Sequence, residues 1–168
     1  IAADRPDHNK HHLAIDPHGM PFYGEYSGPE ICGGKHERGT SWTYKFAGIS
    51  VVDGRRIMLQ AIPMNQFTDK VQLIRELLKT ARRFVKIRAV YLDKEFYSIP
   101  YLKELEASGE RYIVPVRSDK KLNEEKRRYK PMSRVVGTRG CSYYKTVRTV
   151  VSGKESVDVQ TVFLYRPD

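Results

Sequence analysis

Short apolar runs separated by turn residues follow one another along most of this chain, a pattern that favours strands with a few helices between them. Two of these runs are alike. Residues 12–16 (HLAID) and residues 89–93 (AVYLD) each read as a buried strand that ends on an aspartate. An unpaired carboxylate is costly to bury. We therefore expect Asp16 and Asp93 either to share a cation or to lie in solvent at the sheet edge.

The region between these runs predicts a loop followed by a hairpin. Residues 17–39 are rich in Gly, Pro and charge, which is typical of a long loop. Residues 42–52 and 56–62 are apolar or alternating, and the Asp53-Gly54 pair between them is a strong hairpin signal. Three consecutive antiparallel strands are expected from residue 12 to residue 62.

Helical spacing appears after this hairpin. Thr68 is the expected cap of a helix whose inward face carries Ile74, Leu77, Leu78 and Ala81, with Phe84 near its end. Because that helix separates residues 85–92 from the hairpin, their strand should run parallel to the first one. This geometry brings Asp16 and Asp93 to the same sheet edge. A second helix follows, with Ser98 as cap, Pro100 in its first turn, Leu102 and Leu105 inward, Gly109 at its end, and a strand over residues 112–116 after it.

The last third of the chain has a different character. It is charged up to Lys130 and then contains three β-rich runs, over residues 133–136, 141–151 and 157–165. We expect an N-terminal arm (1–11), an α/β core (12–117) and a basic β-rich insertion or accessory segment (118–168). The core order, three antiparallel strands and then helix, strand, helix, strand, is that of a ribonuclease-H-like mixed sheet.

The charge of the chain is concentrated in one region. The net charge is +10, and residues 111–154 contain 13 Lys or Arg against 3 acidic residues, while the rest carries 17 of each. A segment with this charge is typical of a surface that binds phosphates, although it also fits a loop exposed to solvent. Tyr129, Tyr143 and Tyr144 lie among these charges and would suit stacking on DNA, but tyrosine is also common in strands.

Composition excludes several other classes. The chain is 40% apolar and 30% charged, which is typical of a globular domain, it contains no membrane-length apolar run, and we expect no signal peptide. We expect a cytoplasmic protein that reads as a piece of a longer chain. Cys32 and Cys141 are too far apart in sequence to indicate a disulfide framework or a zinc ribbon. His8, His11 and His12 fit a solvated arm better than a zinc site.

Three blocks of sequence carry a resemblance to a known family. They are LAIDPHGMPFYGE, GGKHERGTSWTYKFAGISV and VYLDKEFYSIPYLKELEASGERYIVPVR. Together they resemble the catalytic core of the DDE-type insertion-sequence transposases of bacteria and archaea, a cut-and-paste group with a ribonuclease-H-like fold. In that family the blocks typically contain Ala-Ile-Asp and Tyr-Gly, then Gly-Gly and Gly-Thr, and then Asp-Arg-Gly-Phe-Tyr-Ser with a later Pro-Val-Arg.

This resemblance implies roles for individual residues. Asp16 and Asp93 match the family's first two catalytic aspartates, Tyr97 the tyrosine after the second, and Arg117 the arginine that closes the next strand. Lys94-Glu95 replaces the usual Arg-Gly. No residue matches the third acid, a glutamate on a late helix, and we expect it beyond Asp168. Glu124 and Glu125 are weaker substitutes within the chain.

The function implied is metal-dependent hydrolysis of a phosphodiester at transposon ends, followed by strand transfer to target DNA. Asp16 and Asp93 would hold two Mg²⁺ ions, or Mn²⁺ as a substitute, since hard cations prefer carboxylate oxygens. Two alternatives are equally open for His18: it lies near this metal site, or it is an ordinary loop residue with no role there. DNA would be the partner, with a possible homodimer of the full-length protein and no membrane. Backbone contacts are expected from Arg117, Lys120, Lys121, Lys94 and Tyr97, although Lys94 also fits an ordinary surface position.

Two other hypotheses remain open at this point. One is a non-catalytic DNA-binding remnant of a transposable element, which would fit a chain without the third acid. The other is an unrelated ribonuclease-H-like nuclease, which would prefer RNA–DNA hybrids. The plain alternative for both aspartates is that they only cap loops at strand ends.

Overall fold

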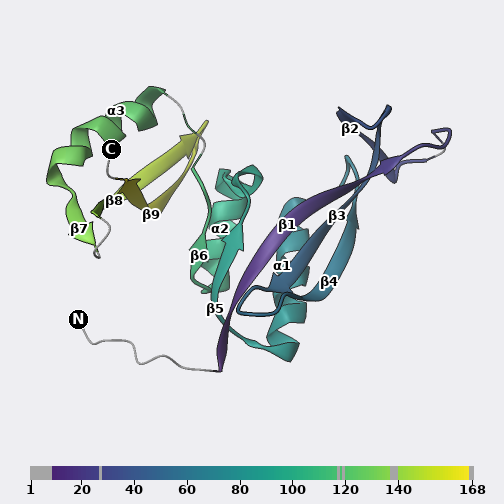
Figure 1. The fold of residues 1–168 in the computed structure, drawn as a ribbon, viewed down its shortest axis with the longest axis horizontal. Helices are drawn as coiled ribbons and strands as arrows, with labels where there is room; N and C mark the ends of the chain where they lie inside the picture. Colours follow the sequence, from purple (N-terminus) through teal and green to yellow (C-terminus); the bar gives the residue numbers. More distant parts are fainter. Residues whose placement is uncertain (1–8, 27, 117, 119, 137–139, 167–168) are drawn as a thin grey trace. The chain divides into compact units, whose positions relative to one another are not determined.

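The computed structural model describes residues 9–26, 28–116, 118, 120–136 and 140–166, and it divides the chain into two compact units, Ile1–Pro115 and Val116–Asp168. Each unit contains its own sheet (Figure 1). No helix in the described ranges is long and apolar enough to cross a membrane.

The first unit is built on a six-stranded mixed sheet. Its strands run in the order β2-β3-β1-β5-β6, and β4 also pairs with β3. β1 is antiparallel to β3 and parallel to β5, as the sequence predicted. The strands are β1 (Lys10–Phe22), β2 (Ile31–Glu37), β3 (Thr40–Val51), β4 (Ile57–Met64), β5 (Lys86–Leu92) and β6 (Tyr112–Ile113).

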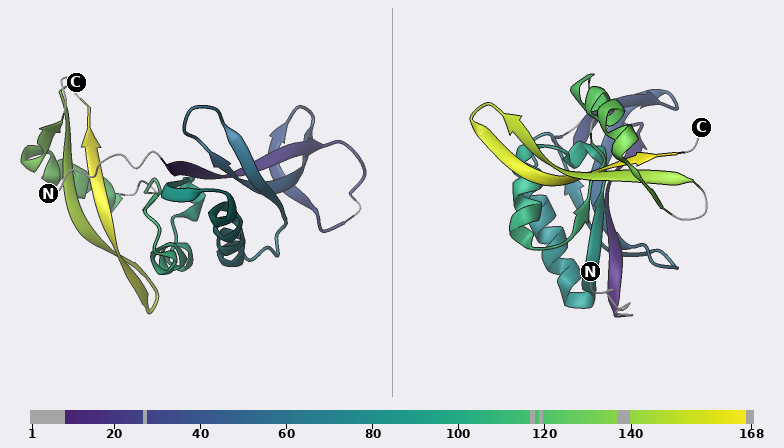
Figure 2. Two further views of the ribbon diagram at one scale, coloured as in Figure 1. Left: turned by 90° about the horizontal axis from the view of Figure 1, so that it is seen from below. Right: turned by 90° about the vertical axis from the view of Figure 1, so that its left-hand side faces the viewer.

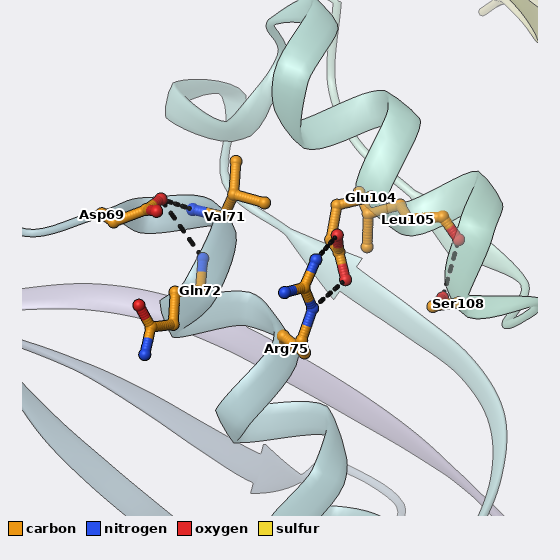
Figure 3. Close-up of polar contacts among 7 residues, drawn as sticks. All are labelled: Asp69, Val71, Gln72, Arg75, Glu104, Leu105 and Ser108. Carbon is orange, nitrogen blue, oxygen red and sulfur yellow. Dashed lines mark hydrogen bonds and ion pairs between the residues drawn. The ribbon is translucent and has the colours of Figure 1, made fainter.

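Two helices, α1 (Lys70–Phe84) and α2 (Ile99–Ser108), cover one face of this sheet (Figure 2). Asp69 caps α1 by accepting the backbone N–H of Val71 and that of Gln72. The guanidinium of Arg75 on α1 pairs with the carboxylate of Glu104 on α2 at 2.6 Å (Figure 3). In the described part of this unit, the opposite face of the sheet carries no helix (Figure 2).

The core lies between the sheet and the helices. Leu13 and Ile15 of β1 are buried against the inward face of α1, and the predicted face of that helix is confirmed. Side chains on a strand alternate between faces, so Ala14 and Asp16 point to the opposite face of the sheet. The main buried residues are Leu13, Ile15, Ala47, Ile49, Val51, Leu73, Ile74, Leu77, Leu78, Ala81, Val90, Leu92, Phe96 and Leu105.

The first strand is longer than predicted. β1 does not end at Asp16 but continues to Phe22, and residues 17–39 are not a single loop because β2 lies within them. Pairing with β3 continues to Phe22 opposite Trp42, whereas pairing with β5 stops at Ile15 opposite Leu92. Beyond Ile15, the edge of β1 that faces β5 therefore no longer pairs with that strand. Proline is tolerated on such an edge, which explains Pro17 and Pro21 inside a strand.

Other expected boundaries also change. The cap of α1 is Asp69 and not Thr68, whose hydroxyl instead accepts the backbone N–H of Asn65. Phe84 is exposed at the end of α1. Ser98 and Gly109 bound α2 as predicted, although the Ser98 side chain makes no cap hydrogen bond. The strand predicted over residues 112–116 is only the two-residue β6.

The second unit pairs one helix with a three-stranded antiparallel sheet. The strands are β7 (Arg134–Val136), β8 (Cys141–Ser152) and β9 (Glu155–Tyr165), and the predicted β-rich runs are confirmed. The charged stretch before them, for which the sequence predicted no helix or strand, forms α3 (Lys120–Tyr129), followed by the short helix η2 (Lys130–Met132). The chain is thus an α/β protein with a mixed sheet, compatible with a ribonuclease-H-like fold.

Candidate active site

The two aspartates singled out by the sequence lie at neighbouring strands, Asp16 within β1 and Asp93 directly after β5. Ile15 of β1 pairs with Leu92 of β5, so Asp16 and Asp93 are one residue beyond the last pair of this parallel ladder. Neighbouring strands are about 4.8 Å apart. Both aspartates are exposed, so they stay in contact with solvent. Because parallel pairing keeps both chains in step, the register places Asp16 and Asp93 next to each other along the sheet.

The backbone around Asp93 orients its carboxylate. Asp93 precedes the short helix η1 (Lys94–Phe96), and its Oδ1 accepts the backbone N–H of Glu95 at 2.8 Å. Phe96 anchors this helix in the core. Asp93 is therefore the cap of η1, and this hydrogen bond orients its carboxylate at the end of β5.

Asp16 and Asp93 line one open cavity of about 630 Å³ on the face of the sheet opposite the buried Ile15 side chain. Gly48, which pairs with Asp16 across β1 and β3, lies in the same lining. A Cβ atom at Gly48 would lie 3.1 Å from the Met58 side chain, so the absence of a side chain there keeps the space beside Asp16 open.

His18 belongs to the same cavity. It follows Asp16 by two residues on β1 and so shares its face, and its ring packs against that of Phe46 at 5.2 Å between centroids. Of the two readings the sequence left open, the structure places His18 in the cavity with the aspartates. It does so because β1 continues through residue 18.

Arg56 is a cation in this cavity that sequence reasoning missed. It lies immediately before β4, exposed, in the lining that also contains Asp16 and Asp93. The only signal was its place just after the Asp53-Gly54 turn, and a turn position does not reveal the face on which a side chain emerges. A guanidinium here can donate two N–H groups to two oxygens of a phosphate group beside the carboxylates.

The donor set suits a magnesium ion that is only partly held by protein. Within the described residues, no group of three His, Cys, Asp or Glu side chains could hold a metal ion. Two exposed carboxylates in one cavity nevertheless match the chemistry of Mg²⁺, which usually takes one or two protein carboxylates and completes its octahedron with water and substrate phosphates. Asp16 and Asp93 would be those ligands.

The three residues predicted to act after Asp93 differ from one another in their surroundings. Lys94 is exposed in η1, and Tyr97 ends that helix half-buried. Glu95, also exposed, lies 4.0 Å from the ammonium group of Lys70 at the start of α1. The contact of Glu95 with Lys70 shows a surface role for this residue, while DNA contact by Lys94 and Tyr97 remains a prediction.

The other predicted DNA contacts lie in the second unit or outside the described residues. Arg117 is outside them. Lys120 and Lys121 do not continue a core strand but are exposed in the first turn of α3. Glu125 on the same helix pairs with Arg148 of β8 at 3.3 Å, which gives it a structural partner. Tyr129 stacks on Tyr144 at 4.5 Å between centroids, so these two rings hold α3 against its sheet.

The histidines assigned to an arm are partly in the sheet. His8 is outside the described residues, whereas His11 and His12 belong to β1. The backbone N–H of His12 donates to Asp53 at 2.6 Å, and its ring stacks on Tyr91, whose hydroxyl lies 3.0 Å from Nδ1. Cys32 and Cys141 are free thiols.

Comparison with protein families gives an independent result. Neither the curated proteins nor the solved structures contain a match to this chain. A family model described as a transposase DDE domain matches residues 7–160, which is most of the sequence and includes both aspartates. Together with the blocks that resemble such enzymes, this match shows that the chain belongs to the DDE transposase family.

Proposed function

We propose that this chain provides the catalytic domain of a DNA transposase, in which Asp16 and Asp93 are the first two metal-binding acids. The observation that carries the proposal is that the two carboxylates end the parallel ladder of β1 and β5 and line one open cavity. The family supports a role in DNA transposition, and the metal ligands and the individual steps are our inference.

In the first step, water attacks a phosphorus atom at the transposon end, and the bond to the 3′ oxygen breaks to leave a free 3′-hydroxyl. In the second, this hydroxyl attacks a target phosphodiester and displaces the target's own 3′ oxygen. Divalent metal ions, when bound, activate the attacking oxygen and stabilise the departing one. Asp16 and Asp93 would hold and orient the metal, and Arg56 would bind a non-bridging phosphate oxygen.

A non-catalytic DNA-binding remnant is the second candidate. One observation favours it: in the parts of the chain that are described, three acidic or other metal-binding side chains do not come together. Glu125 is already paired with Arg148 within the second unit, so it is a poor substitute for a third acid.

Calorimetric titration of Mn²⁺ and Mg²⁺ in the presence of a short DNA duplex tests the proposal. The variants are Asp16→Asn and Asp93→Asn, because asparagine keeps the size of the side chain and, at position 93, an oxygen that can still accept the N–H of Glu95. Glu25→Gln is the matched control, since it removes one carboxylate from an exposed position after β1.

We expect the parent and Glu25→Gln to bind metal alike and each aspartate variant to bind at least tenfold more weakly. Equal binding by the parent and both aspartate variants would refute the assignment of these residues. A parent that binds DNA but no metal would favour the non-catalytic remnant instead.

A further inference from the structure

The outer strands of the two sheets differ in how well they are protected from further pairing. Backbone N–H and C=O groups along the free side of an outer strand can pair with another chain, and proteins block such edges with short strands, bulges, proline or lysine. β6 and β7 have only two and three residues, β4 contains Pro63, and the register of β2 shifts between Gly33 and Glu37. Each of these four edges therefore has some protection.

The outer strand β9 has none of these protections. Within the described part of the second unit it pairs on one side only, with β8, and it is 11 residues long. Its sequence, ESVDVQTVFLY, contains no proline, lysine or arginine, and its pairing with β8 runs without a register shift. Val162 and Leu164, near its end, are 52% and 69% exposed. A long, regular edge with exposed apolar side chains is the kind of edge that pairs with another strand.

The charges at the two ends of β9 indicate which strand would fit this edge. The charged residues of β9 itself, Glu155 and Asp158, both lie at its start. At its other end, the described lining of a cavity of about 450 Å³ contains four cations and no carboxylate: Lys126, Arg127, Lys130 and Arg166. An antiparallel copy of β9 would bring opposite charges together at both ends, whereas a parallel copy would bring like charges together. The edge is therefore complementary to itself.

One register satisfies both the charges and the hydrogen bonds. In a hairpin closed by a two-residue turn, the residues that flank the turn bond to each other, and the ladder alternates from there. Ser152 and Glu155 flank the turn between β8 and β9, so Asp158 and Val162 direct their backbone N–H and C=O groups away from β8. With Val162 opposite its own copy, Asp158 lies opposite Arg166.

We propose that β9 pairs antiparallel with β9 of a second copy of this chain, about a two-fold axis at Val162, so that the two three-stranded sheets become one continuous sheet. Asp158 of each copy lies opposite Arg166 of the other. Because the contact is symmetric, each favourable pair occurs twice. This contact needs neither metal nor DNA, so it stands or falls separately from the function proposed above.

Sedimentation velocity of the full chain over a concentration series, without DNA or metal, measures the association. We expect a reversible equilibrium between monomer and dimer. Amide hydrogen exchange in β9 should slow as the dimer forms, while exchange in α1 stays constant. A chain that remains monomeric up to its solubility limit overturns the proposal, and so does a dimer in which exchange of β9 is unchanged.

A charge at the two-fold axis separates edge pairing from other kinds of contact. Val162→Lys places two ammonium groups opposite each other, next to Lys145 of β8 in each copy, and should weaken dimerisation roughly tenfold or more. Val147→Lys is the matched control, because Val147 is exposed on the same face but belongs to the central strand β8. It should dimerise like the parent. An equal loss in both variants would mean that the sheets pack face to face, which overturns edge pairing.

Charge reversal tests the register. Asp158→Arg alone puts two arginines opposite each other at both ends of the contact, and Arg166→Asp alone puts two aspartates there, so each should weaken dimerisation roughly tenfold. The double variant again places an acid opposite a base and should dimerise more tightly than either single variant. Circular dichroism checks that each variant keeps its β structure. A double variant that dimerises more weakly than both single variants overturns the proposal.

Discussion

The two units of this chain bury their sheets to very different extents. In the first unit, β1, β3 and β5 pack against α1 and share an extensive buried core. Among the described residues of the second, those that are buried are Val159, Thr161, Phe163 and Tyr165 on one face of β9, and α3 has no buried residue. The first unit is held mainly by apolar burial, and the second relies more on aromatic stacking and polar contacts.

This difference matches what each unit carries. In the proposed function, Asp16 and Asp93 must be held in a fixed relation to share a metal site, and a strand ladder backed by a packed core would provide that rigidity. The proposed binding of DNA phosphates needs charge more than rigidity, and residues 111–154 account for the whole net charge of +10. The comparison predicts that stability depends mainly on substitutions in the first unit and affinity for duplex DNA mainly on substitutions in the second.

The largest effect is expected from the first core. Leu77 is fully buried on α1, so Leu77→Ala should destabilise the first unit by about 2–5 kcal/mol through lost burial and the cavity left behind. The matched control in the second unit is Leu164→Ala, at an exposed position of β9, which should change stability by less than about 0.5 kcal/mol. Urea unfolding followed by circular dichroism measures both. Similar losses would show that the second sheet is also part of a buried core.

The second effect concerns α3. Tyr129 stacks on Tyr144 and contacts Phe163 at 5.5 Å, so Tyr129→Ala removes two ring contacts and should loosen the helix by roughly 1–3 kcal/mol. Hydrogen exchange should then become faster in α3 and stay unchanged in α1. Faster exchange in both helices would mean that the units are not independent in stability.

Sequence reasoning located most of the first unit because its signals were local. The inward positions of α1, the hairpin after Asp53-Gly54 and the parallel strand before Asp93 all follow from periodicity and turn chemistry. The extension of β1 beyond Asp16 was missed because Pro17 and Gly19 are poor strand formers. It is long-range pairing with β3, on one side only, that keeps those residues extended.

Local sequence signals predicted the candidate site only in part as well. Asp16 and Asp93 were predicted from their motifs and do line one cavity, but Arg56 enters it only through the hairpin, and His18 only because β1 continues. In the second unit, α3 was missed because its charged sequence offers few apolar positions to mark a helical face. Contacts distant in sequence, such as that between Glu125 and Arg148, hold it in place.

A third prediction concerns charge in the second unit. Lys120 and Lys121 are exposed in α3, so the double substitution Lys120→Gln with Lys121→Gln should weaken duplex binding roughly tenfold at 0.1 M salt. The slope of log affinity against log salt should fall by about 1.8, about 0.9 for each lost phosphate contact. Fluorescence anisotropy over a salt series measures both quantities.

The matched control places the same change in the first unit. Lys79→Gln with Arg83→Gln removes two exposed cations from α1 and should leave the slope unchanged. If the two double variants lose affinity equally, the DNA footprint is spread over the whole chain, and the proposed division of charge and rigidity between the units is wrong.

The smallest effect is a pH dependence in the first unit. Burial, and then the hydrogen bond from the Tyr112 hydroxyl to Glu106 at 2.6 Å, raise the pKa of Tyr112 above its ordinary value of 10. The folded state therefore keeps the proton where the unfolded chain loses it, so this contribution to stability is complete below pH 10 and falls as the pH rises further. By pH 11 the loss should be roughly 1 kcal/mol.

Tyr112→Phe should lack that part of the decline, although the lost hydrogen bond lowers its stability at pH 8. Tyr23→Phe, which removes an exposed hydroxyl, should follow the parent, and an equal decline in all three proteins between pH 8 and pH 11 would contradict the role of Tyr112.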